Sequence, residues 1–418
     1  MVIALLISST WSFQNSQARQ QRLERATTSE QYAPSFDSSS LPTYILAGGQ
    51  NGQWFSQSQY PELYRVVFSG DIHEAAPLFT VSGSGTVWTG GWNGSSWLIT
   101  GWGDSQGLNP YFEYYDSVAE TGVNSSNYAQ ASAAESEWSG GDIFSSTWNG
   151  SMWLLTGMGS GALEPDSWIS NHYSMAFLTR NGTFIDISSS IPNNSDGILY
   201  TSSWNGNYWL VGGGYYGFDN GILLEVFSDG TIVDVTSSIG QWVPELDSIQ
   251  SIAWNGTDWM IGGVGFLAEY NPSTGGVYDL TGSLDSALGT NDSLGNAETN
   301  SINSIVWTGS EWMIAGGVPI AFEGTEKQAA WVAVMDTNNK ASDLTAKAIP
   351  PSILTENSMS SILSMACDRY GCVLGGFAGD NPVLLWYNGQ STTNLSVSLP
   401  SGGMTYVEWV GVSDEVFV

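Results

Sequence analysis

Carboxylates are the side chains in this sequence best suited to catalysis. Two example pairs in predicted loops are Glu164 with Asp166 and Asp104 with Glu120. A glycoside hydrolase needs only two suitably spaced acids, one to donate a proton and one to act as base or nucleophile. Acids in loops are usually solvated, however, and sequence does not test their spacing. We therefore predict no catalytic residue and keep a secreted glycan-processing hydrolase or lyase that uses loop carboxylates as the alternative function.

Other catalytic chemistry lacks the residue types that it needs. The only histidines, His73 and His172, fall in different repeats, which nearly excludes histidine-based triads. The glycines of Val211-Gly-Gly-Gly-Tyr read as a turn between strands rather than a phosphate loop. No metal-ligand spacing is present, and two cysteines are too few for a zinc site. We predict no metal and no cofactor.

The net charge is strongly one-sided. The 418 residues include 40 Asp and Glu but 9 Lys and Arg, which gives a formal charge of −31 at pH 7. This charge argues against nucleic acid and anionic lipid as partners. In a medium acid enough to protonate every carboxylate, the 9 Lys and Arg with the 2 His would leave +11, a moderate charge. The composition indicates a surface adapted to acid, or alternatively a neutral extracellular protein coated with glycans.

Glycosylation sequons support a location outside the cell, although chance produces many sequons in a chain rich in Asn, Ser and Thr. The predicted N-glycosylation sites are Asn93, Asn124, Asn149, Asn181, Asn193, Asn255, Asn291 and Asn394.

The N-terminus reads as an anchor followed by a linker. Residues 1–28 begin with MVIALLISSTWSF and continue as a polar, arginine-containing stretch, which predicts a short hydrophobic helix held in a membrane or against other subunits. The alternative is the remainder of a removed signal sequence. Residues 29–43 are rich in Ser, Thr and Pro and read as a linker. We expect an extracellular, cell-surface protein anchored by this segment.

The rest of the chain repeats. Gap-free segments such as VWTGGWNGSSWLITGWG recur at spacings of 56, 56, 50, 53 and 60 residues, a period typical of four-stranded propeller blades. Within each unit, Asn-Gly between two apolar runs predicts a hairpin. Glycine after the second strand indicates close backbone packing near the ring centre. The anchor residues of the repeats are Trp92, Trp148, Trp204, Trp254, Trp307 and Cys367.

The fourth strand repeatedly ends in an acidic or amide residue, an aliphatic residue and a hydroxyl, as in Asp234-Val-Thr. A charged residue at one recurring place predicts a turn or a hydrogen bond between units rather than catalysis in every unit.

The two ends of the repeat region complete each other. Tyr44–Gly49 matches a second strand without a first, and Thr405–Val410 matches a first strand without a second. We predict an all-β propeller over residues 44–418, in which these strands pair and six internal units plus one composite unit make seven blades. Such pairing removes an exposed sheet edge.

The cysteines occupy the places of a tryptophan pair. Each Trp-x-x-x-x-Trp pair, such as Trp254 and Trp259, faces across a hairpin, and Cys367 and Cys372 replace both members in the last full unit. Such a pair has Cα atoms about 4.5 Å apart, which a disulfide can bridge. We predict a disulfide.

An aromatic cluster lies at the start of the longest insertion, between residues 103 and 141. We expect most of it to form an added outer strand packed on its blade. The alternative is a binding surface for a glycan or protein, which makes these residues the candidate binding surface. The members of the cluster are Tyr111, Phe112, Tyr114 and Tyr115.

The WNG-x-x-W hairpin with its glycine-rich turn resembles the repeats of kelch, galactose-oxidase-like and sialidase-like β-propellers, and is similar to surface propellers of acid-loving archaea. The sialidase Asp-box has no good match, and the arginines Arg65, Arg180 and Arg369 are too scattered for a sialidase-like triad. A galactose-oxidase-like copper site lacks its histidines. The resemblance therefore implies architecture, and we expect a surface propeller with structural, adhesion or protein-contact roles.

Overall fold

The computed structural model describes most of the repeat region. The predicted anchor at residues 1–28, with its short helix, and the linker at residues 29–43 lie outside the described part. The residues that it describes are 44–51, 60–67, 76–80, 84–104, 110–116, 121–123, 141–160, 171–192, 197–214, 221–241, 247–289, 301–317, 330–354, 359–399 and 406–412.

In this part of the chain all sheets are antiparallel, with five sheets of four strands and one of eight. The sheet that joins the two ends of the chain contains β28 (Tyr406–Val412), β1 (Tyr44–Asn51), β2 (Tyr60–Val67) and β3 (Ala76–Thr80). The next contains β4 (Ser84–Trp92), β5 (Trp97–Asp104), β6 (Pro110–Asp116) and β7 (Thr121–Val123). The third contains β8 (Asp142–Trp148), β9 (Met152–Ser160), β10 (Asn171–Thr179) and β11 (Phe184–Asp186).

The same order of strands recurs in the second half. One sheet contains β12 (Ile198–Trp204), β13 (Trp209–Gly214), β14 (Ile222–Val226) and β15 (Ile232–Asp234). Another contains β16 (Ile249–Trp254), β17 (Trp259–Gly263), β18 (Leu267–Asn271) and β19 (Gly276–Asp279). The eight-stranded sheet begins with β20 (Ser301–Trp307), β21 (Trp312–Gly317), β22 (Trp331–Met335) and β23 (Ala341–Asp343). It ends with β24 (Ser360–Cys367), β25 (Cys372–Ala378), β26 (Asn381–Tyr387) and β27 (Thr392–Asn394). The strand pairing that joins the two halves is that of Gly317 with Ser361.

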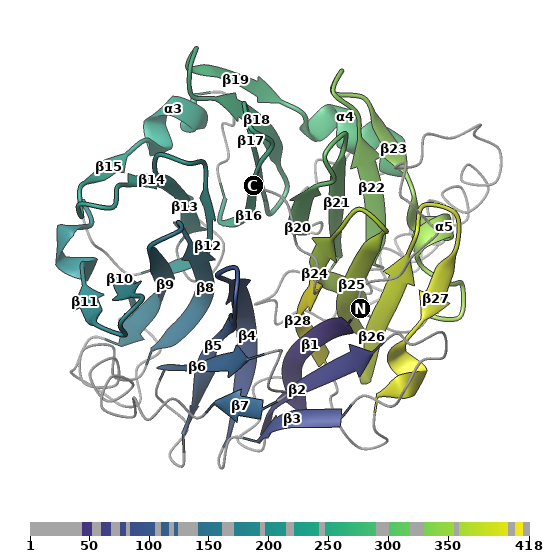
Figure 1. Ribbon diagram of the computed structural model, residues 1–418. Helices are drawn as coiled ribbons and strands as arrows, with labels where there is room; N and C mark the ends of the chain where they lie inside the picture. Colours follow the sequence, from purple (N-terminus) through teal and green to yellow (C-terminus); the bar gives the residue numbers. More distant parts are fainter. Residues whose placement is uncertain are drawn as a thin grey trace, which may run out of the picture.

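The four-stranded units are arranged around a common axis, which makes the fold a β-propeller (Figure 1). The strands nearest the axis, called the innermost strands below, are β28, β4, β8, β12, β16, β20 and β24. Each of them contacts the next, and β24 contacts β28.

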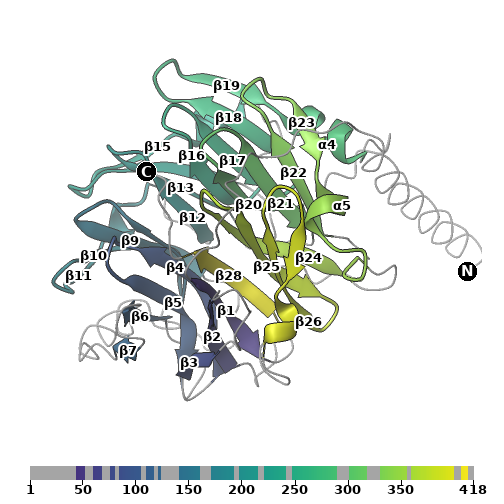
Figure 2. The ribbon, with the colours of Figure 1, turned by 45° about the vertical axis from the view of Figure 1, so that its right-hand side comes forward.

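The C-terminal strand is the innermost strand of the first unit. β28 pairs with β1 over six residue pairs, among them Gly48 with Trp409 and Ala47 with Val410. Figure 2 shows β28, in yellow, beside β1, in purple. These are the segments that the sequence predicted to pair.

Five units begin with a hairpin whose two strands are joined by a tryptophan pair. Trp204 pairs with Trp209 and their rings lie 4.5 Å apart, and Trp254 pairs with Trp259 at 4.7 Å. The turn is closed by an asparagine side chain, because Oδ1 of Asn255 accepts the backbone N–H groups two and three residues later. The following glycine has a positive φ that favours glycine, 100° at Gly256.

Four of the fourth strands, β11, β15, β19 and β23, end in an aspartate that makes a turn inside its own unit. Oδ1 of Asp234 accepts the backbone N–H of Thr236 at 2.9 Å, and the Thr236 hydroxyl accepts the N–H of Leu223 on the third strand at 2.9 Å. Asp279 with Thr281 and Asp343 with Thr345 repeat these bonds. The predicted turn function of these residues is confirmed.

The turn starts a short helix in each unit that has one described. These helices are η1 (Ser188–Ser190), α3 (Thr236–Gly240), α4 (Thr281–Leu288), α5 (Thr345–Ala348) and η3 (Ser396–Ser398). Within the described ranges, none of the helices has the length and apolar character needed to cross a membrane.

Neighbouring units are packed through glycine. A Cβ atom at Gly212 on β13 would lie 2.4 Å from Ile249 on β16, and one at Gly262 on β17 would lie 2.6 Å from Ile302 on β20. Gly48 and Gly375 receive Val87 and Val407 in the same way, whereas the equivalent position in the other three units is occupied by Thr100, Thr156 and Ala315. The predicted close backbone packing after the second strand is confirmed.

Hydroxyl groups add hydrogen bonds between innermost strands. Oγ of Ser251 accepts the N–H of Ile305 at 2.9 Å. Ser304 and Ser364 do the same for Met365 and Val410, so this bond also joins β24 to the C-terminal strand β28.

Replacing Gly262 by alanine tests the packing between units. We expect Gly262→Ala to lower the free energy of unfolding by about 1–3 kcal/mol, because the new Cβ overlaps Ile302 and Ile305. Gly282→Ala in α4 is the matched control, since a Cβ there meets nothing within 4 Å and alanine favours a helix. Urea denaturation measures both, and equal stability of the two variants would contradict this packing.

Candidate functional site

Every innermost strand carries a one-residue β-bulge at the same position of its pairing with the second strand. The register with the second strand skips one residue in each unit, for example Gln250 between Ile249 and Ser251. We call the seven skipped residues the axial ring. They are Trp88, Phe144, Tyr200, Gln250, Asn303, Leu363 and Glu408.

A second glycine makes room for each bulge. A Cβ at Gly213 would lie 2.2 Å from the carbonyl oxygen of Ile198, and one at Gly263 would lie 2.1 Å from that of Ser248. The backbone carbonyl next to the bulge therefore occupies the space that a side chain at this glycine would need. Where the repeat has two adjacent glycines, as at Gly212 and Gly213, the first makes room between units and the second within the unit.

Three consecutive members of the axial ring are aromatic. The rings of Trp88 and Phe144 lie 5.1 Å apart, and those of Phe144 and Tyr200 lie 5.6 Å apart in an edge-to-face arrangement. Trp88 and Phe144 are half-buried, whereas Tyr200 is buried. This aromatic arc covers three neighbouring units.

The opposite side of the axial ring is polar. Gln250, Asn303 and Glu408 are all buried. Nδ2 of Asn303 donates to Oγ of Ser361 at 2.8 Å, and Ser301 donates its hydroxyl to Oε1 of Gln250. Nε2 of Gln250 is buried without a hydrogen-bond partner, which leaves a donor available.

A carboxyl group with a raised pKa lies beside the aromatic arc. Burial raises the pKa of Asp142 from its ordinary 3.8 to about 7, and the indole of Trp88 offsets part of this rise. Asp142 precedes Phe144 by two residues on β8. At neutral pH this carboxyl can donate or accept a proton.

The carboxylate pairs singled out in the sequence are not brought together in the described part of the chain. Asp104 ends β5, with its side chain outside the description, and Glu120, Glu164 and Asp166 lie outside it altogether. His172 is exposed on β10, and His73 is outside the described residues. Groups of three or more His, Cys, Asp or Glu that could hold a metal do not occur in the ranges that are described.

The aromatic cluster lies on β6, which is the third strand of its sheet rather than an added outer strand. Phe112 is 7% exposed and packs with Leu98 and Trp153, and Tyr114 packs against the same core. Alternation along the strand turns these two side chains inward, so Phe112 belongs to the core rather than to an exposed surface. The side chains of Tyr111 and Tyr115 are outside the description.

The arginines of the propeller are far apart in the fold. Arg65 lies on β2 over the ring of Tyr44, with 4.7 Å from its guanidinium carbon to the ring centre. Arg180 is exposed in the turn between β10 and β11, and Arg369 lies in the turn between β24 and β25. They form no triad, as the sequence indicated.

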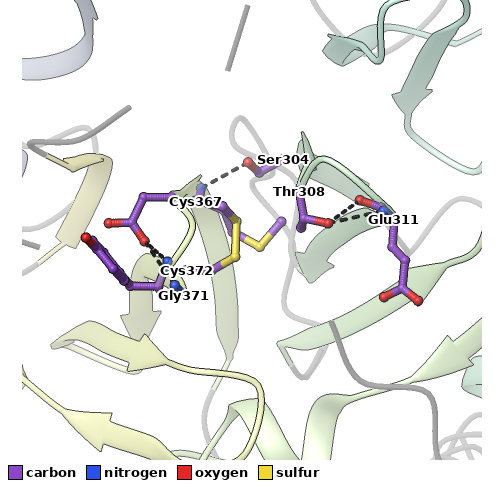
Figure 3. The surroundings of a disulfide bond; sticks show 9 residues. Ser304, Thr308, Glu311, Cys367, Gly371 and Cys372 are labelled. Carbon is purple, nitrogen blue, oxygen red and sulfur yellow. Dashed lines mark hydrogen bonds between the residues drawn. A yellow bond between two sulfur atoms is a disulfide. The ribbon is translucent and has the colours of Figure 1, made fainter. Parts of the chain in front are cut away.

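The cysteines form a disulfide at the predicted place. Cys367 pairs with Cys372 across the first hairpin of its unit, with Cα atoms 4.0 Å apart, somewhat closer than the predicted spacing. Figure 3 shows this disulfide in the hairpin, with the turn from Thr308 to Glu311 of the preceding unit nearby. Both cysteines are buried.

The described sequons lie in turns that the asparagines stabilise. Oδ1 of Asn93, Asn149 and Asn255 each accepts two backbone N–H groups in the first hairpin, and Asn394 accepts that of Ser396. Asn181 is exposed in the turn between β10 and β11. Asn124, Asn193 and Asn291 are outside the described residues. Glycosylation stays a prediction. The hydrogen bonds in these turns explain why asparagine occupies these positions even without a glycan.

The axial ring was not predicted from the sequence. Its signal was present, because each bulge residue precedes the anchor residue of its repeat by four positions, as Gln250 precedes Trp254. That position holds a different residue type in every unit, so the repeat pattern conceals it.

Comparisons with known proteins give similarity to solved structures only. No protein-family model matches the sequence, and no curated protein matches it either. The Pyrococcus horikoshii acylaminoacyl peptidase is 9% identical over 84% of this chain, with a TM-score of 0.47, and this chain spans about half of its length, 50%. A protein assigned as a 6-phosphogluconolactonase from Bacteroides fragilis is 11% identical over 90% of this chain and 99% of its own, with a TM-score of 0.48. TolB from Acinetobacter baumannii is 11% identical, covering 88% of this chain and 82% of its own, with a TM-score of 0.42. Similarities at this level carry no argument about function.

Stability against pH tests the raised pKa of Asp142. Since this pKa is raised on folding from 3.8 to about 7, Asp142 contributes stability that is fully present below about pH 4 and is lost as the pH rises toward 7. Between these two pKa values, Asp142 lowers the free energy of unfolding by up to about 1.4 kcal/mol for each unit by which the pH rises. We expect Asp142→Asn to lack this loss of stability with rising pH when urea denaturation is measured between pH 4 and 7.

The control for this measurement is Asp229→Asn. Hydrogen bonds from Thr231 lower the pKa of Asp229, so its contribution is lost as the pH falls, which is the opposite sign. An Asp142→Asn profile parallel to that of the wild type would show that the carboxyl has an ordinary pKa.

Proposed function

We propose that this chain is an extracellular, cell-surface propeller of seven blades that contacts proteins or glycans without turning them over. The observation that carries the proposal is the buried disulfide between Cys367 and Cys372. Structural disulfides form and persist in oxidising compartments outside the cytosol. This one replaces an aromatic pair that the other hairpins use, so it belongs to the scaffold rather than to a redox site.

The seven-bladed, closed arrangement is supported by the contacts of the innermost strands. The sequence of contacts from β28 through β4 to β24 returns to β28, and its junction uses the same interactions as the other units. Val87 packs at Gly48, and Val407 packs at Gly375, as Ile249 does at Gly212. A ring of this kind has no exposed innermost edge, which suits a protein displayed in a harsh medium.

Adaptation to acid is supported by the charge balance. With 40 carboxylates and 9 Lys and Arg, most carboxylates have no cation of their own. Burial raises the pKa of Asp142, Glu269 and Glu311, so these groups stabilise the fold most when protonated. Kelch-like, sialidase-like or archaeal relationships, glycosylation and an anchor at residues 1–28 remain parts of this proposal. The partners proposed for residues 1–28 are a membrane or other subunits.

Glycan processing is the second candidate. It is favoured by Asp142, whose pKa of about 7 would suit a general acid beside the axial ring. A catalytic carboxyl at the axis differs from the loop carboxylates that the sequence suggested.

Surface labelling of intact source cells tests the proposed location. We expect an antibody against the propeller to bind without permeabilisation, and a maleimide to modify Cys367 and Cys372 of the unfolded protein only after reduction. Chemical reduction in the same sample is the control for labelling efficiency. Binding only after permeabilisation, together with two free thiols, would contradict an extracellular protein.

A further inference from the structure

We propose that Glu269 and Asn339 form a clasp between two neighbouring units, and that the clasp is tighter in acid than at neutral pH. Glu269 lies on β18, the third strand of its unit, and Asn339 lies in the turn between β22 and β23 of the next unit. This inference rests on the adaptation to acid proposed above and names one contact through which it acts.

The turn at 336–340 and the residue after it are held by the preceding unit through three hydrogen bonds. Nδ2 of Asn339 donates to Oε2 of Glu269 at 2.8 Å. The hydroxyl of Ser283 donates to the carbonyl oxygen of Asn339 at 2.9 Å and accepts the N–H of Ala341 at 3.3 Å. Ser283 belongs to α4, which contacts both β18 and β23 (Figure 1). The clasp therefore joins the outer parts of two units rather than their innermost strands.

The turn itself does not favour asparagine at position 339. Its φ is 62°, and among the residues that the structure describes it is the one non-glycine residue with a positive φ. The same turn, closed by the same two backbone hydrogen bonds, has Gly182 at this place in one unit and Gly230 in another. Asparagine adopts this left-handed conformation more readily than most residues do. In exchange for the conformational cost, the turn gains a side chain that reaches Glu269.

Glu269 is half-buried and close to a second carboxylate. Burial raises its pKa from the ordinary 4.5, the hydrogen bond from Asn339 offsets part of this rise, and the charge of Asp258 adds to it. β17 carries no titratable side chain. The remaining titratable groups on β19, on α4 and in the turn at 336–340 are Tyr278, Asp279, Asp285, Asp336 and Lys340.

Protonation of Glu269 gives the clasp a second hydrogen bond. A carboxylate only accepts, whereas a protonated carboxyl also has one O–H that donates. Oδ1 of Asn339 accepts no hydrogen bond from the described part of the chain, and it belongs to the same amide as the Nδ2 that already contacts Glu269. A protonated Glu269 can donate to this oxygen while it accepts from Nδ2, and it is no longer repelled by Asp258. The ionised form keeps one bond and carries a half-buried charge.

Hydrogen exchange of residues 336–343 in the full chain tests the clasp, measured from pH 4 to 7 and corrected for the intrinsic exchange rate. Since the pKa of Glu269 is raised on folding, its contribution is fully present below about pH 4.5 and is lost as the pH rises through the pKa of the folded state. We expect the protection factor of this segment to fall at least about threefold over this range, where one proton allows at most about tenfold per pH unit.

Glu269→Gln is the decisive variant, because glutamine stays neutral and both donates and accepts at every pH. We expect its protection factor to keep the acid value of the wild type from pH 4 to 7. Asn339→Gly removes the clasp and introduces the residue that the same turn has at Gly182 and Gly230. We expect it to remove most of the pH dependence, which is the quantity compared because glycine also relieves backbone strain.

Glu225→Gln is the matched control. Glu225 holds the equivalent position on β14, the third strand of the preceding unit. The turn of the unit that follows it has Gly275 at its positive-φ position, with no side chain to reach Glu225. We expect this variant to keep the pH dependence of the wild type at residues 336–343.

The outcomes separate this inference from the proposed function. A wild-type protection factor that stays constant or rises between pH 4 and 7 would overturn the clasp. A fall that persists in Glu269→Gln, or that disappears in Glu225→Gln, would do the same. Each of these results leaves the contact function and the location outside the cell standing, because surface labelling tests them separately.

Discussion

At four junctions of this propeller, at Gly48, Gly212, Gly262 and Gly375, one unit approaches the next where a glycine receives an aliphatic side chain. Ile249 lies at Gly212 and Ile302 at Gly262, in each case where a Cβ would come within 3 Å. The close approach lets the serine hydroxyls of one innermost strand bond the backbone of the next. The same interaction occurs where the C-terminal strand enters, with Val407 at Gly375. At these four junctions the close packing of the units therefore depends on a residue without a side chain, whereas Thr100, Thr156 and Ala315 hold the same position in the other three units.

The next residue of the second strand is also a glycine, and it makes room for the bulge of the innermost strand. Its missing side chain admits a carbonyl of the innermost strand, as at Gly213, and that displacement produces the bulge. The bulge residue does not pair with the second strand, so its residue type can vary without loss of backbone pairing. The seven bulge residues accordingly differ in type, and the three adjacent aromatic ones contact one another.

Much of the fold could be predicted from the repeats because its determinants are local. The pairs Trp254 with Trp259 and Cys367 with Cys372 define a hairpin by spacing alone, and Asp234-Val-Thr defines a turn through bonds within a few residues. The strand that completes the first unit could be predicted because Tyr44–Gly49 and Thr405–Val410 each lacked a partner. The bulges could not, since they depend on the register between two strands. The inward orientation of Phe112 was missed because an aromatic residue suits a core and a surface equally.

Hydrogen exchange of the C-terminal strand tests most directly whether one packing interaction continues through every unit. The account predicts that amides of Tyr406–Val412 exchange as slowly as those of the innermost strand β24, because β28 pairs with β1 and contacts β24 and β4. Exchange of this segment at the rate of an unstructured peptide, while β24 stays protected, would contradict it.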